Sequence, residues 1–162
     1  MYYDKKPYNK RYSPCDSSRK SYYSGRYPYR GLRDHGPYPY VTNIHKLALR
    51  NNAFRTALWT GEYLQLTLMC IDVKDDIGLE MHPDVDQFLR IEQGQGLVMM
   101  GEDKNNLCYK ERLREDYVIF IPAGTWHNLI NTGNIPIKLY SIYAPPNHPH
   151  GTIHVKKEDE EH

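Results

Sequence analysis

Two stretches of the chain decide the fold: residues 78–94 read GLEMHPDVDQFLRIEQG, and residues 122–131 read PAGTWHNLIN. Each combines a turn signal with a short β-rich run. Gly94, at the end of the first stretch, and Gly96 just after it permit the positive φ angles of a tight hairpin turn, between strands expected over 86–93 and 97–100. In the second stretch, proline and glycine turn the chain before a strand over 126–131. Both stretches therefore predict short strands joined by tight turns.

The sequence on either side continues this pattern. A short helix is expected over 44–50, where it is ended by two asparagines. Residues 63–73 alternate leucines and Cys70 with Gln65 and Thr67, as in a strand. The other strands are expected over 54–60, 107–113, 117–121 and 136–144. About eight short strands with almost no helix predict an all-β barrel or double-sheet jelly roll.

The first forty residues have a different composition. Residues 1–40 contain ten of the 15 tyrosines, nine Lys or Arg and three Asp, and they lack Ile, Val, Phe and Trp. Such a segment cannot bury enough apolar surface to offset the entropy of ordering it, so we expect a disordered basic arm. The folded domain is expected over 41–154, and the acidic residues 155–162 are expected to fray. The net charge of +1 thus averages a basic arm and an acidic body.

Composition excludes several classes of protein. No apolar run approaches the roughly 20 residues that cross a membrane, and the first residues have no apolar core of a signal peptide. Cys15, Cys70 and Cys108 are too few and too widely spaced for a disulfide framework. There is no nucleotide-binding glycine motif, and basic residues outside the arm form no stripe for specific nucleic-acid binding. We expect a cytoplasmic protein.

Candidate metal ligands occur in both stretches. Glu80 and His82 are two residues apart, so on an extended strand their side chains share a face. His127 lies near the start of the strand that follows the proline-glycine turn. Carboxylate and imidazole groups are deprotonatable donors of the kind a metal needs, so two strands of a barrel can present three ligands to its interior.

The second stretch resembles the second motif of the cupin superfamily, PxGxxHxxxN, at Pro122, Gly124, His127 and Asn131. The first stretch resembles the other cupin motif, HxHx4Ex6G, with His82 and Gly94 matching. Glu80 and Gln87 occupy the places of a histidine and a glutamate, and Lys74 and Asp116 occupy those of the glycines that open the motifs. Over 41–154 the chain is similar to small single-domain cupins of the bacterial group labelled mannose-6-phosphate isomerase-like, a label that itself rests largely on fold.

The resemblance implies a cupin-type double-stranded β-helix with a divalent metal held by Glu80, His82, Gln87 and His127. Two histidines and one carboxylate suit Mn, Fe, Zn or Ni. Gln87 offers a neutral amide oxygen, a poorer ligand than glutamate, so metal binding is expected to be weakened. A metal-dependent isomerase also needs a base that moves a proton, and Glu80, if it is not a ligand, and Tyr140 are the catalytic candidates.

Other residues have less weight as site candidates. His148, His150 and His154 resemble a second metal cluster, but the proline and glycine among them favour a surface loop. Arg90 is expected to face away from the metal, because it lies an odd number of places from Gln87. Arg90 and Lys138 are the two candidates for binding a phosphate or carboxylate group. Asp86 is expected to point opposite to Gln87, and Asn131 to be a turn or hydrogen-bonding residue.

Three functions remain open at this point. The first is a metal-dependent enzyme that acts on a small molecule, such as a sugar-phosphate isomerase. The second is a structural cupin assembled through its arm, because residues 1–40 resemble the Tyr/Lys-rich segments of spore coat proteins in composition; such a protein would be deposited in the coat. The third is a module that binds a small ligand without reacting it. We also expect a homodimer, paired through an edge strand at 54–60.

Overall fold

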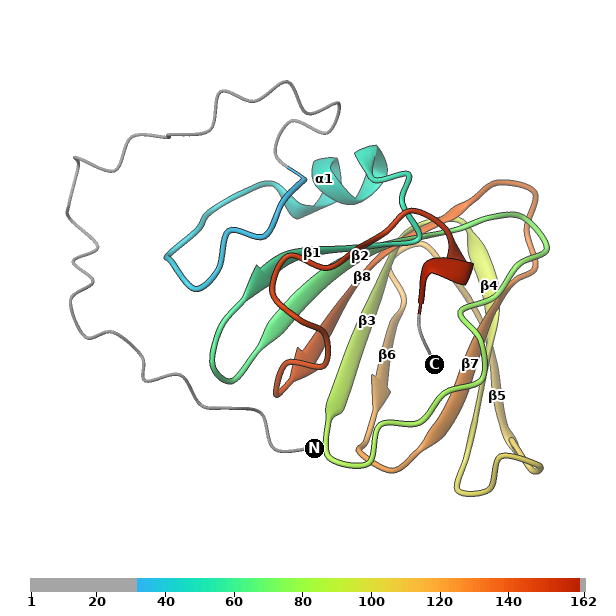
Figure 1. The fold of residues 1–162 in the computed structure, drawn as a ribbon. Coiled ribbons are helices and arrows are strands. Elements are labelled where there is room, and N and C mark those ends of the chain that lie inside the picture. Colours follow the sequence, from blue (N-terminus) through green and yellow to red (C-terminus); the bar gives the residue numbers. More distant parts are fainter. Residues whose placement is uncertain (1–31, 161–162) are drawn as a thin grey trace, which may run out of the picture.

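The computed structural model describes residues 32–160, which form two antiparallel sheets facing each other (Figure 1). The strand order is β6-β3-β8-β2-β1-β9 in the larger sheet and β5-β4-β7 in the smaller. The elements are α1 (Ile44–Arg50), β1 (Arg55–Thr60), β2 (Gln65–Ile71), β3 (Asp86–Gln93), β4 (Gln95–Gly101), β5 (Tyr109–Arg114), β6 (Val118–Ile121), β7 (Trp126–Asn131), β8 (Ile137–Ala144), β9 (Ile153–His154) and the 3-10 helix η1 (Lys157–Asp159). The all-β jelly-roll prediction is confirmed, and the expected helix coincides with α1.

The main apolar core lies between the two sheets. Met69, Leu89 and Leu139 face it from the larger sheet, and Val98 and Leu129 face it from the smaller sheet. All are buried, as expected where alternate residues of each strand point inward. This core closes one part of the barrel with apolar side chains and leaves polar inward-facing positions elsewhere in the barrel.

A second apolar layer lies outside the larger sheet, under α1 (Figure 1). Asn43 caps the helix by accepting a hydrogen bond from the Lys46 backbone N–H at 2.9 Å. Leu47 of the helix packs against Leu58 and Leu68 of β1 and β2. The leucines of β2 therefore face the helix, whereas Gln65 and Thr67 point into the barrel and are fully buried.

The last residues of the expected arm belong to the folded body, so the predicted boundary at residue 40 is wrong for 32–40. Leu32 is buried in the outer layer. The Asp34 carboxylate accepts hydrogen bonds from the backbone N–H of Thr60 at 3.0 Å and of Gly151 at 3.0 Å. The Trp59 indole donates to the Tyr38 carbonyl at 2.8 Å. Residues 1–31, which contain most of the tyrosines, lie outside the described residues.

The edge of β1 is covered by the chain itself, which contradicts pairing of two subunits through 54–60. The Ala57 N–H donates to the Thr152 carbonyl at 2.8 Å, and the Leu58 carbonyl accepts from the His35 N–H at 2.8 Å. β9 pairs with the start of β1. These bonds satisfy the backbone groups that an edge strand would offer to another copy. Homodimer formation stays a prediction and requires a different surface.

The C-terminal residues up to Glu160 are also attached to the barrel rather than frayed. η1 follows β9 directly, and Lys157 pairs with Asp75 at 3.1 Å and with Asp76. Arg55 and Glu160 form a buried ion pair at 2.7 Å. These contacts oppose the fraying expected from the run of charges, because each charge in them has a partner of opposite sign.

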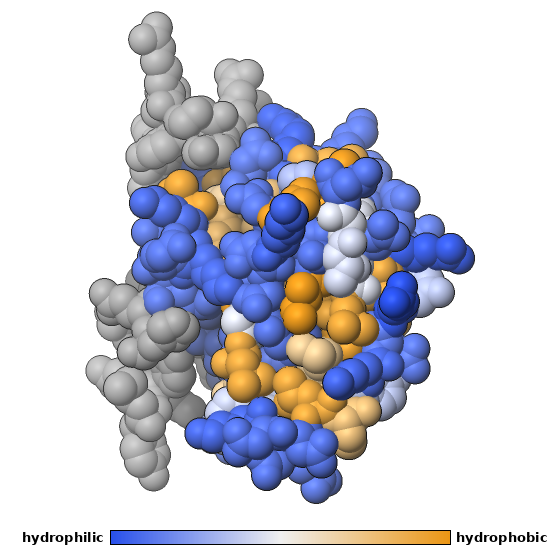
Figure 2. All heavy atoms as spheres, turned by 90° about the vertical axis from the view of Figure 1, so that its right-hand side faces the viewer, coloured by the Kyte–Doolittle hydropathy of each residue, from blue (hydrophilic) through white to orange (hydrophobic). Residues whose placement is uncertain are grey.

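The outer face of the smaller sheet is partly apolar. Figure 2 shows this side of the molecule, with hydrophobic residues gathered among hydrophilic ones. Leu97 and Met99 alternate with buried Val98 along β4 and are half-buried on this face. Among residues 32–160, no helix has the length and apolar character needed to span a membrane.

Candidate metal centre in the barrel

Glu80 and His127 are held together by their backbones. The Glu80 N–H donates to the His127 carbonyl at 3.0 Å, and the His127 N–H donates to the Glu80 carbonyl at 2.9 Å. Through this bridge, Glu80 pairs with the free edge of β7, on the side opposite to β4. The bridge brings Nε2 of His127 to 3.3 Å from Oε1 of Glu80. Residues 47 positions apart thus meet through a two-bond backbone contact.

His82 completes a cluster of three. Its Nε2 lies 3.5 Å from the same Glu80 oxygen, and one ligand atom from each of Glu80, His82 and His127 falls within 4.8 Å of the others. Nδ1 of His127 lies 2.9 Å from the Thr125 carbonyl, which can only accept, so Nδ1 carries the proton. That tautomer leaves a lone pair on Nε2, facing the cluster, as in metal-binding histidines.

Gln87 lies beside this cluster on β3. It is 3 % exposed, and its backbone partner in β8 is Tyr143, whose ring is 5.8 Å from that of His82. The amide nitrogen of Gln87 donates to the Ser141 hydroxyl at 2.9 Å, which leaves its Oε1 buried without a hydrogen-bond donor. Asp86 points the other way, as expected, and accepts from the Ala123 N–H at 2.9 Å.

The donor set fits a divalent metal ion. It offers two imidazole nitrogens and a carboxylate oxygen, and His82 Nε2 and, on β3, Gln87 Oε1 are buried without a hydrogen-bond partner. Buried polar atoms without partners are costly, and a cation would satisfy those that have lone pairs. Burial alone raises the pKa of Glu80, but the neighbouring imidazoles of His127 and His82 and the charge of Arg55 outweigh it and hold that pKa well below its usual range. Glu80 therefore stays ionised.

The structure adds residues that sequence reasoning missed. Arg55, Tyr143 and Glu160 lie beside the cluster, together with His148 and His154, which the sequence had suggested only as members of a separate cluster. Arg55 donates to the Tyr143 hydroxyl, and the Tyr143 ring is 5.2 Å from that of His148, which is 6.1 Å from His154. The signal for Arg55 was a charge inside the apolar run FRTALW. No local signal marked Glu160, which is brought there by the turn after β9.

Tyr140 is not at the cluster, so its selection as a catalytic candidate is wrong. Inward positions of β8 are those of Ser141 and Tyr143, and Tyr140 points to the opposite face, where it packs in the outer layer under α1. The outer position follows from the two-residue period of a strand. Tyr143, three residues later, is the tyrosine that reaches the interior.

The histidines of the last loop divide between two environments. His148 and His154 face the barrel interior, whereas His150 is exposed and lies 3.3 Å from Asp34. They do not form a second metal cluster, and the surface-loop interpretation is wrong for His148. Burial and the charge of Arg55 lower the pKa of His148 to about 3.

The two candidate phosphate-binding residues have structural partners instead. Arg90 pairs with Glu92 and, at 2.9 Å, with Asp116 on the outer face, away from the metal ligands as expected. Lys138 is buried, and its ammonium donates to the Asn51 carbonyl and, at 2.9 Å, to the Asn52 side chain, at the end of α1. Neither residue faces the cluster.

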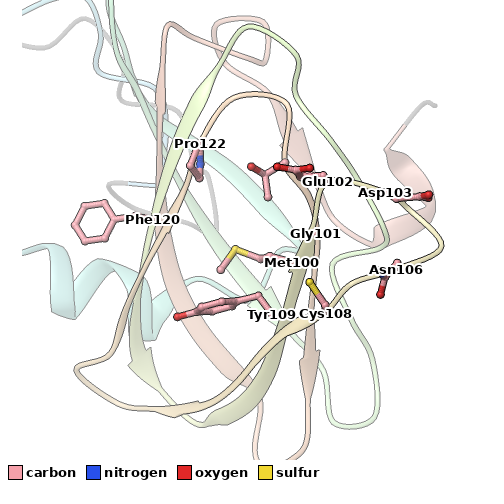
Figure 3. A pocket seen from close by; sticks show the side chains of 10 residues that line it. Met100, Gly101, Glu102, Asp103, Asn106, Cys108, Tyr109, Phe120 and Pro122 are labelled. Carbon is pink, nitrogen blue, oxygen red and sulfur yellow. The ribbon is translucent and has the colours of Figure 1, made fainter.

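A hollow of about 510 Å³ lies near β4–β6 (Figure 3). It is lined by Met100, Gly101, Glu102, Asp103, Asn106, Cys108, Tyr109, Phe120, Pro122 and Thr125. None of the four predicted metal ligands lines it. This hollow is therefore separate from the cluster of Glu80, His82 and His127.

Two departures from the motifs have a visible backbone consequence. Lys74 and Asp116 stand where the motifs open with glycine, and they are the two non-glycine residues with positive φ in the described chain, at 68° and 69°. The left-handed conformation is retained although the side chain disfavours it.

Comparison with known proteins gives one family and close relatives. The family model described as the cupin domain matches residues 67–143. The protein YrkC of Bacillus subtilis (strain 168) is 60% identical over 128 residues, which are 79% of this chain and 69% of YrkC. Protein L612 of Acanthamoeba polyphaga mimivirus is 43% identical over 119 residues, 73% of this chain and 72% of L612.

A solved structure has a similar overall fold. The crystal structure of BH2720 from Bacillus halodurans superposes with a TM-score of 0.78 at 62% identity, covering 79% of this chain and 97% of that one. These likenesses concern sequence and fold.

Proposed function

Since the chain belongs to the cupin family, we propose that it binds a divalent metal ion inside its barrel and acts there on a small molecule. The observation that supports the proposal is the convergence of Glu80, His82 and His127 within 4.8 Å. Gln87 is the fourth proposed ligand, through its unpartnered Oε1. Two imidazoles, one carboxylate and one amide favour Mn, Fe, Zn or Ni over Mg or Ca, which prefer oxygen ligands.

A bound metal ion supplies Lewis-acid chemistry, polarising a carbonyl or hydroxyl oxygen of the small molecule. The protein supplies the rest. Burial raises the pKa of Tyr143, so its hydroxyl keeps its proton and can donate to an oxygen of the bound molecule. Arg55 fixes that hydroxyl by donating to it. The Thr125 carbonyl fixes the orientation of the His127 ring.

The reaction proposed is a proton shift next to a carbonyl, as in a sugar-phosphate isomerase. Glu80 is the proposed base only in a form of the site in which it does not bind the metal, because a coordinated carboxylate is a weak base. The structural alternative depends on the arm, most of which lies outside the described residues, and it stays a prediction. The third function, a module that binds a small ligand at the same metal site without converting it, also stays a prediction.

Metal content tests the proposal. We expect protein purified without added metal, or reloaded after chelation, to carry Mn, Fe, Zn or Ni by elemental analysis. His127→Ala should lose that metal, and His150→Ala should keep it, because His150 is exposed and outside the cluster. Wild-type protein that takes up none of these metals would refute the proposal. Turnover of hexose phosphates by the loaded protein then separates an isomerase from a ligand-binding module.

A further inference from the structure

The barrel interior contains a buried arginine that metal binding does not explain. Arg55 is 0% exposed. Its guanidinium donates to the Tyr143 hydroxyl and to Oε1 of Glu160, while its Nε is buried without a partner. Placing a charge in a protein interior costs several kcal/mol before its interactions are counted. A guanidinium has five N–H donors in a planar fork that matches carboxylates, so this group is suited to bind one.

The interior also contains most of the unsatisfied polar atoms. Of six buried side-chain nitrogen and oxygen atoms without a hydrogen-bond partner in the described chain, five belong to residues grouped around Tyr143: Arg55 Nε, Thr67 Oγ1, His82 Nε2, Gln87 Oε1 and His154 Nδ1. The proposed metal ion would satisfy only His82 Nε2 and Gln87 Oε1. Contacts through Tyr143 and its β-sheet neighbours connect them. Buried polar groups in folded proteins are nearly always paired, so this concentration indicates a site for a polar ligand.

The carboxylate now bound to Arg55 comes from the end of the described chain. Glu160 follows η1, and its side chain is 14% exposed. The segment that carries it begins at β9, whose two residues pair with the start of β1. It then passes to the loop at Asp75 and Asp76, where Lys157 binds (Figure 1). Lys157, which anchors it there, is partly exposed. Up to Val155, whose carbonyl accepts from the Phe54 N–H at 3.1 Å, the segment is tied to the sheet. Beyond Val155, Lys157 and the Arg55–Glu160 pair are its side-chain ties to the barrel, so the part that carries Glu160 can open without disturbing the sheet.

We infer that Arg55 is the anion-binding residue of the metal centre, that its ligand is a small carboxylate, and that Glu160 occupies the place of the ligand carboxylate until the ligand displaces it. The part of this inference that concerns the metal end of the ligand rests on the proposed function. Tyr143 connects the two ends, because its hydroxyl accepts from Arg55 and its ring contacts that of His82. A carboxylate is favoured over phosphate because the guanidinium already binds one, that of Glu160. The inference therefore keeps the proton shift of the proposed function and replaces the sugar phosphate by a small molecule that carries a carboxylate.

The test uses metal-free, full-length protein, so that its result does not depend on metal binding. Acetate and inorganic phosphate are titrated in separate experiments while the Nε–H signal of Arg55 is followed by NMR. We expect Glu160→Gln to bind acetate about tenfold more tightly than wild type. This is the gain expected if Glu160 leaves Arg55 free in only about a tenth of wild-type molecules. Glu158→Gln is the matched control. Glu158 is exposed on the same segment, and its substitution removes the same charge as that of Glu160.

Arg55→Lys should lose acetate binding, because lysine keeps the charge but not the fork. Thermal unfolding shows whether that variant is folded; if it is not, the comparison of Glu160→Gln with Glu158→Gln decides alone. Equal acetate affinity in those two variants would overturn the inference, and phosphate binding tighter than acetate would overturn the carboxylate assignment. Failure of the proposed function would appear separately, as protein that binds acetate but takes up no metal.

Discussion

Glu80 and His127 exchange two backbone hydrogen bonds, and their side chains approach to 3.3 Å. The same bridge therefore sets both the register of the chain and the spacing of two proposed ligands. Side-chain substitutions leave these backbone bonds in place. Changes in metal affinity upon substitution at this site thus report on the donor atoms rather than on a displaced strand.

Gln87→Glu is expected to strengthen metal binding. It places a carboxylate where an unpartnered amide oxygen now lies. One additional charge close to a divalent ion contributes more than about 1.4 kcal/mol, or tenfold in affinity. Competition with a chelating dye measures the change. The metal-free variant should be less stable than wild type, because the new charge lies in the same buried site as ionised Glu80. Unchanged metal affinity would show that Gln87 is not a ligand.

Lys74→Gly is expected to stabilise the protein by about 0.5–1 kcal/mol. A non-glycine residue in the left-handed region costs about 1–2 kcal/mol, part of which is offset by the larger entropy of glycine in the unfolded chain. Lys74 is exposed and has φ 68°. Lys104→Gly, at an exposed turn position without positive φ, should instead destabilise. Chemical unfolding compares the two, and a loss of stability in both variants would contradict the expectation.

Asn131→Ala is expected to destabilise the barrel by about 2–4 kcal/mol without changing its metal content. The Asn131 side chain donates to the carbonyls of Ile71 and Ile135 and accepts from the Gly133 N–H, all within 3.1 Å. These bonds confirm the sequence interpretation of Asn131 as a hydrogen-bonding residue. Asn134→Ala, at an exposed position of the same turn, is the control. Loss of metal from folded Asn131→Ala would assign this residue to the metal site.

Acidification is expected to destabilise the protein through His148. Its pKa is lowered from 6.5 to about 3 by burial and by the charge of Arg55. Between these values the unfolded chain binds a proton that the folded protein does not, so stability is full above pH 6.5 and falls toward pH 3. The slope from one such group is at most about 1.4 kcal/mol per pH unit. Urea unfolding at several pH values should show a shallower loss in His148→Gln, and an identical slope would contradict this account.

Sequence periodicity predicted most strands well because β2 to β8 each place residues of one face in the main core. The same alternation located Gln87 and Asp86 on opposite faces. It failed for Tyr140 because a strand under a covering helix has two buried faces, and pattern alone does not say which is the interior. Arg55 and Glu160 were missed for another reason: their pairing joins the first strand to the end of the described chain, a contact with no local signature.

The leucines of β2 lie under residues that the composition assigned to a tail, and this fixes where the chain can be cut. A shortened protein for crystallisation that starts at Val41 would lack Leu32 and the carboxylate of Asp34. It would uncover the outer apolar layer and leave the Thr60 N–H without its acceptor. The start of a well-behaved fragment therefore lies before Leu32, so that the outer apolar layer keeps its cover and the Thr60 N–H its acceptor.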